Sequence, residues 1–223
     1  MRAIIFLRLS IILMGITAAK VTLAENKLIK LDTIKNIIPA KLADSFNVII
    51  DGKQVSLFKL ENKHGTKAYI TNYGGRLVSL YVHDKYGKMK DVVQGFDNVR
   101  DYQKSTEPYF GATIGRYSNR IAKGRFILNN KVYKLFINNA PNTLHGGKRG
   151  FRDVVWDAKQ LNSGILELSY LSKDMEEGFP GDLKVKVIYS LTEDNSLKIT
   201  YEASTDKTTV INLTNHAFFN LNG

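Results

Sequence analysis

Short apolar runs separated by turn residues fill the chain from Phe46 onward. The run 183–189 largely alternates apolar residues with lysine at period two, which is typical of a strand that buries one face. Asp51-Gly52 and Asn129-Asn130 predict two-residue hairpin turns, because Asn, Asp and Gly tolerate a positive φ. The pattern predicts an all-β sandwich formed by one domain over residues 46–223. The strands we expect include 48–58, 67–71, 77–82, 126–135, 165–170, 183–189 and 197–201.

The composition limits the chemistry that the chain can perform. Its 223 residues, 43% hydrophobic and 24% charged, are enough for one substantial core, in which we expect the single tryptophan, Trp156. The absence of cysteine excludes disulfide bonds, a thiolate nucleophile, cysteine-ligated zinc or iron–sulfur sites and a lipoprotein anchor. The net charge is +11, but the lysines and arginines are scattered along the sequence, so we expect no nucleic-acid partner.

Residues 1–24 have the layout of a secretory signal peptide. A basic start at Arg2 precedes apolar residues, and small residues follow, so cleavage is expected after Ala19 or Ala24. The alternative is an uncleaved anchor helix, but Arg8 leaves an apolar stretch that is shorter than a membrane span. We expect an exported protein, periplasmic or secreted, with no stable membrane anchor after cleavage.

Residues 25–45 form a polar segment that we interpret as a linker. One short helix is expected in it, limited on its N-terminal side by Pro39. Two glycine pairs, Gly74-Gly75 and Gly146-Gly147, predict tight turns or close backbone approach. Neither pair precedes a helical pattern, so a phosphate cradle is not favoured.

Two of the four histidines lie in motifs rich in asparagine, threonine and aromatic residues. His145 and His216 have hydrogen-bonding neighbours, and Phe218 offers an apolar wall, which is how proteins bind sugars. Histidine is also the side chain best suited to move protons near neutral pH. The alternative for each is a structural histidine. His64 and His83 lie in polar turns and are expected at the surface.

Arg120, beside Asn119, carries a forked set of donors that suits neighbouring hydroxyl groups. The alternative is a surface arginine at a strand edge, paired with an acid. The acidic segment 174–182 lacks the ligand spacing of a calcium loop, and its Gly-Phe-Pro-Gly sequence is typical of a shaped turn, structural or at the edge of a substrate site. We expect neither a metal ion nor a cofactor.

Together these motifs closely resemble the aldose 1-epimerase, or galactose mutarotase, family. The resemblance implies a mutarotase-type β-sandwich, also called a supersandwich. It also implies interconversion of the α and β anomers of a free aldose such as glucose or galactose. The matching segments are 72–77, 91–95, 115–124, 141–147, 176–181 and 212–216.

The resemblance also assigns roles to single residues. His216 matches the family's general acid, which protonates the ring oxygen, and His145 matches the histidine near the anomeric centre. Asn119 and Arg120 match the sugar-binding pair. Phe218 stands where many members have tyrosine, so one hydroxyl contact is absent.

Members of the family continue past Gly223, through strands that bring a binding aspartate and the catalytic glutamate base. The chain resembles the first two thirds of the family domain, and we interpret it as a C-terminally truncated member. Two other interpretations stay open: a non-catalytic or degenerate carbohydrate-binding protein, and a structural sandwich module of a larger carbohydrate-active enzyme.

We therefore expect the 223-residue chain to have negligible mutarotase activity. Ring opening needs a base for the O1 proton as well as an acid for O5, and each contributes roughly 10²–10⁴-fold. Polarimetry of freshly dissolved α-D-glucose or α-D-galactose tests this. Saturable acceleration would contradict it and direct attention to Glu176 and Glu177 as substitute carboxylates.

Overall fold

The computed structural model describes residues 39–222. The predicted signal peptide, 1–24, and most of the predicted linker lie outside these residues. Within the described part, no helix has the length and apolar character needed to cross a membrane.

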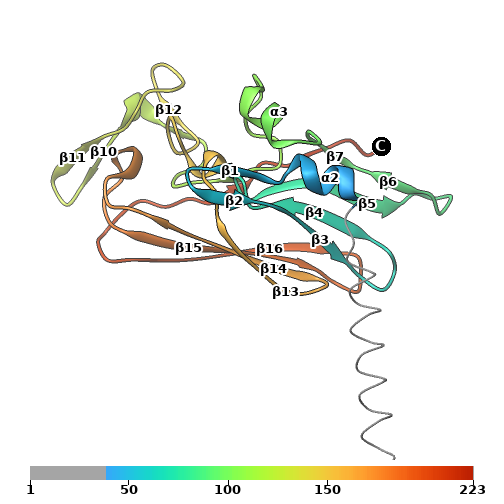
Figure 1. Ribbon diagram of the computed structural model, residues 1–223. Helices are drawn as coiled ribbons and strands as arrows, with labels where there is room; N and C mark the ends of the chain where they lie inside the picture. The colour runs from blue at the N-terminus through green and yellow to red at the C-terminus, as the bar shows by residue number, and fades with distance from the viewer. Residues whose placement is uncertain (1–38, 223) are drawn as a thin grey trace, which may run out of the picture. The chain divides into compact units, whose positions relative to one another are not determined.

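Two antiparallel four-stranded sheets lie one above the other, as Figure 1 shows. One sheet has the strand order β3-β4-β5-β6 and the other β13-β14-β15-β16. The strands are β3 (Leu57–Glu61), β4 (Lys67–Thr71), β5 (Arg76–His83), β6 (Met89–Asp91), β13 (Asp157–Asn162), β14 (Ile165–Ser172), β15 (Leu183–Leu191) and β16 (Leu197–Thr205). Each strand pairs with its neighbour in the chain, so both sheets are meanders. The predicted all-β sandwich is confirmed.

The core forms because β15 alternates as the sequence predicts. Its odd-numbered residues from Leu183 to Leu191 are buried, while the even-numbered ones are less buried or exposed. Leu60 and Ile70 of the other sheet belong to the same buried cluster, as does Trp156, which is 1% exposed. Each large apolar side chain buried this way contributes roughly 1.5–3 kcal/mol, so this layer holds the sheets together.

Helices are short and lie outside the sandwich layers. The helix expected after Pro39 is α2 (Ala40–Ser45), whose Leu42 packs against a second cluster that contains Phe46. A further helix, α3 (Val99–Lys104), has no sustained helical period in the sequence. Asn98 caps it, accepting from the Asp101 N–H at 2.9 Å, and its Tyr102 is buried.

The predicted hairpin turns are confirmed. Asp51-Gly52 connects β1 (Val48–Ile50) to β2 (Lys53–Val55), and Asn129-Asn130 connects β10 (Arg125–Leu128) to β11 (Lys131–Lys134). All four turn residues have positive φ, as two-residue turns of this type require.

The prediction for Gly74 is also confirmed. A Cβ atom at this position would lie 2.2 Å from the Arg152 carbonyl oxygen, so only glycine allows the two backbones to approach.

Candidate active site

Three short antiparallel ladders bring the predicted motifs together. The first pairs β8 (Thr113–Ile114) with β17 (Thr214–Asn215), directly before His216. The second pairs β9 (Arg120–Ile121) with β12 (Thr143–Leu144), directly before His145. The third pairs β7 (Val93–Gln94) with β18 (Phe218–Phe219), just after His216. The ladders place both histidines, far apart in the sequence, at one site.

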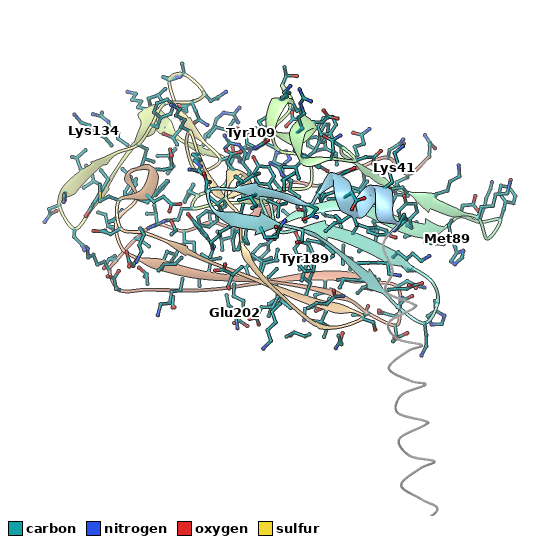
Figure 2. All side chains as sticks on the ribbon, in the orientation of Figure 1. Lys41, Met89, Tyr109, Lys134, Tyr189 and Glu202 are labelled. Carbon is teal, nitrogen blue, oxygen red and sulfur yellow. The ribbon has the colours of Figure 1, made fainter. Side chains whose placement is uncertain are left out.

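The two imidazole rings are in edge-to-face contact, with 5.0 Å between their centroids. Tyr109 packs against both: it lies edge-on to His145 at 4.7 Å and is stacked on His216 at 5.3 Å. The Arg152 guanidinium covers the Tyr109 ring at 5.0 Å from its centroid. Figure 2 labels Tyr109 on the side of the sandwich where α3 and β12 lie.

Sequence reasoning missed Tyr109 and Arg152. Neither lies in a histidine motif, and the contacts of Tyr109 with both histidines arise only when distant segments fold together. The available signal was the aromatic pair Tyr109-Phe110 directly before the glycine-containing segment that leads to Arg120.

A reciprocal pair of hydrogen bonds fixes His145 to Asn119. The His145 N–H donates to the Asn119 carbonyl at 3.0 Å, and the Asn119 N–H donates to His145 Nδ1 at 3.0 Å. Both residues have positive φ, a conformation that Asn and His adopt more readily than most residues. Because Nδ1 accepts a hydrogen bond here, the neutral ring carries its hydrogen on Nε2; this tautomer is assigned from the bond.

The surroundings keep His145 neutral. Burial, and to a smaller extent the neighbouring His216, Arg152 and Arg120, together lower its pKa to about 4. At neutral pH the ring is therefore a hydrogen-bond donor through Nε2–H, suited to orient an oxygen rather than to give up a proton.

His216 is positioned by the backbone and by a core tyrosine. Its N–H donates to the Ala112 carbonyl at 2.8 Å, and its carbonyl accepts from the Gly111 N–H at 3.2 Å. The preceding Asn215 donates through its amide to the Gly111 carbonyl at 2.8 Å and to the Tyr189 hydroxyl at 3.0 Å. Tyr189 is fully buried in β15, so the position of His216 is coupled to the rigid core.

Arg120 and Asn119 lie exposed beside the histidines. The Arg120 Nε donates to the Asn139 side-chain oxygen at 3.0 Å, and NH1 donates to the Asn119 side-chain oxygen at 3.4 Å. These partners are amides rather than carboxylates, which disfavours the alternative of an acid-paired surface arginine. Amide contacts leave the guanidinium charge free to meet hydroxyl groups.

Phe218 lies against His216, with 5.0 Å between ring centroids, and against Phe110 at 5.1 Å. The apolar wall expected next to the histidine is therefore present in the structure. Its neighbour Phe219 is 56% exposed.

The other two histidines are not brought to this site. Both are exposed, and His83 Nε2 lies 3.2 Å from the His64 carbonyl oxygen. The acids of segment 174–182 are engaged within the fold. Glu176 accepts from the Tyr170 hydroxyl at 2.9 Å, and Glu177 accepts two backbone N–H groups.

A hollow of about 530 Å³ opens elsewhere, on the β13–β16 sheet, where Tyr170, Lys186 and Glu202 line it. Its lining contains no histidine. We place the site at the histidine pair because proton transfer depends on the chemistry of the groups rather than on volume.

The comparisons with known proteins identify the family. Residues 56–223 match the sequence profile of the aldose 1-epimerase family. The chain belongs to this family. It is 47% identical to the galactose mutarotase of Bos taurus over 169 residues, which cover 76% of the chain and 48% of that protein. It is 38% identical to the aldose 1-epimerase of Haemophilus influenzae over 173 residues, 77% of the chain and 49% of that protein.

Solved structures of relatives have the same fold. A GalM/aldose epimerase homologue from C. elegans superimposes with a TM-score of 0.73 at 33% identity, covering 76% of this chain and 52% of that one. Galactose 1-epimerase from Lactobacillus acidophilus NCFM gives 0.69 at 30% identity, with coverages of 78% and 51%. The chain spans about half the length of the curated relatives it matches.

We predict that His145 makes the stability of the fold depend on pH. Its folded pKa of about 4 lies below the ordinary 6.5, so the unfolded chain binds more protons between these values. The contribution of the neutral His145 ring to the free energy of unfolding is fully present above pH 6.5 and is lost as the pH falls towards 4. His145→Asn removes it while keeping an acceptor for Asn119 and a residue that tolerates positive φ.

Urea unfolding of both proteins from pH 4 to 7.5 tests this. The difference in unfolding free energy should rise with pH by less than about 1.4 kcal/mol per pH unit, because the ring is only partly buried. A difference that stays constant over this range would contradict the assignment.

Proposed function

We propose that the described site binds a free aldose and supplies the proton-donating side of its anomerisation. The observation that carries this proposal is the contact of His216 with a neutral His145, beside Asn119 and Arg120. Bovine galactose mutarotase and the aldose 1-epimerase of Haemophilus influenzae share the family of this chain. The substrate class follows from the amide, guanidinium and aromatic groups at the site, which suit a neutral polyhydroxylated ring.

The two histidines have different roles in this proposal. His216 protonates the ring oxygen O5 as the ring opens, while His145 holds the anomeric oxygen through its Nε2–H. Removal of the O1 proton needs a base; the motif resemblance assigns that base to a glutamate in the further strands of family members. A neutral His145 avoids a second positive charge next to the donor.

A second candidate is a carbohydrate-binding protein without catalysis. It is supported by the fact that the binding groups Asn119, Arg120 and Phe218 lie together at the histidines. The carboxylates of Glu176 and Glu177 instead accept hydrogen bonds from Tyr170, Lys148 and Arg149. The two candidates share the binding step and differ in whether turnover follows.

The test is polarimetry on a chain extended to the length of the relatives by their C-terminal half. His216→Ala should lower kcat by roughly 10²–10⁴-fold, the usual loss for a general acid. Arg120→Ala should also raise KM, because its contacts to hydroxyls form before the transition state.

His64→Ala and His83→Ala are matched controls and should leave turnover unchanged. Near-parental turnover in His216→Ala would refute the assignment, and binding without turnover in the extended parent chain would favour the second candidate.

We also propose that the protein is exported. This rests on the order of the basic start, the apolar stretch and the small residues in 1–24, which precede the described fold. N-terminal sequencing of the mature protein should then begin near Lys20 or Glu25. A soluble product that retains Met1 would contradict export.

A further inference from the structure

The carboxylate of Glu177 caps the turn that follows His145. One oxygen accepts from the Lys148 N–H at 2.8 Å and the other accepts from the Arg149 N–H at 3.1 Å. Both oxygens are therefore used on successive backbone amides, three and four residues after His145. A charged acceptor makes such bonds stronger than bonds between neutral groups.

The turn itself has no space for side chains. A Cβ atom on Gly147 would lie 2.4 Å from the Glu177 carboxylate, and one on Gly146 would lie 1.8 Å from the Gly115 carbonyl oxygen. Both glycines have positive φ, at +106° and +87°. The backbone after His145 is thus held between the Gly115 backbone on one side and the Glu177 carboxylate on the other.

Glu177 is held by the segment that supplies Asn119. Arg116, three residues before Asn119, is 2% exposed and donates into the ends of the 173–182 segment that carries Glu177. Its acceptors are the Ser172 carbonyl and hydroxyl and the carbonyls of Lys173, Pro180 and Gly181, at 2.8–3.1 Å. One buried guanidinium therefore links the Asn119 segment to the acid that caps the His145 turn.

We propose that Glu177 is a positioning residue that keeps His145 Nδ1 on the Asn119 N–H and directs Nε2–H towards the sugar. This inference rests on the proposed function of His145. It also assigns Glu177 a role different from that of a substitute base, because both of its carboxylate oxygens already accept backbone N–H groups.

The experiment compares Glu177→Gln with Glu176→Gln in the chain itself, without sugar. Gln at 177 keeps one acceptor but turns an NH₂ group towards the second N–H donor. Glu176 is a matched control, since it lies next to Glu177, loses the same charge and accepts from Tyr170 rather than from the His145 turn. The readouts are amide exchange at Asn119, referenced to amides of the β14–β15 ladder, and the NMR titration of the His145 ring.

In Glu177→Gln we expect exchange at Asn119 to become roughly 10–100-fold faster, the scale of a lost hydrogen bond to a charged group. The pKa of His145 should rise from about 4 towards its ordinary 6.5, because the loosened turn lets water reach the ring. Glu176→Gln should leave both readouts unchanged. Wild-type values in a folded Glu177→Gln would overturn the proposal.

If Glu177→Gln does not fold, Glu177→Asp decides by the same readouts. It keeps the charge, but a carboxylate one methylene shorter reaches only one of the two amides, so both readouts should move in the same direction. Failure of both variants to fold would assign Glu177 to stability alone and overturn the positioning role. Because sugar is absent, these results are independent of the activity test. If the extended chain shows no turnover while Glu177→Gln still raises the pKa of His145, the proposed function is refuted and the positioning role of Glu177 is not.

Discussion

The hydrogen bond from the Asn119 N–H to His145 Nδ1 is the contact on which the site depends. It joins the Asn119–Arg120 segment to the His145 turn at 3.0 Å, and it decides which ring nitrogen carries the hydrogen. The other tautomer, with its hydrogen on Nδ1, could not accept from the Asn119 N–H and would leave Nε2 with a lone pair in place of a donor. Burial then keeps the ring neutral, with a pKa of about 4. The tautomer of His145 therefore follows from one backbone amide, and its neutral state follows mainly from burial.

This bond is maintained by the layers beneath it. Arg116 and Glu177 hold the Asn119 segment and the His145 turn against the same loop. On the other side, Asn215 binds the hydroxyl of Tyr189, which belongs to the β15 strand of the core. Both histidines are thus held by rigid elements, and the distance between them is fixed before a ligand binds. Catalytic groups held in this way lose little entropy on binding.

Much of the fold could be predicted from the sequence, because local patterns specify it. The period-two run in β15 and the Asn-Asn and Asp-Gly turns determine strands and hairpins without reference to distant residues. Helix α3 escaped prediction because six residues are too few to show a helical period, and its stability comes from a cap and from the buried Tyr102. The site was predicted only in part. The motifs indicated the two histidines, but Tyr109, Arg152 and the low pKa of His145 arise from contacts between segments far apart in the chain.

¹⁵N-resolved NMR of the His145 ring measures both its protonation and its tautomer in the folded chain. We predict a neutral His145 ring from pH 5 to 8, with the hydrogen on Nε2; His64 and His83 provide reference signals in the same spectra. A wild-type His145 that carries its hydrogen on Nδ1, or that becomes charged near pH 6.5, would contradict it.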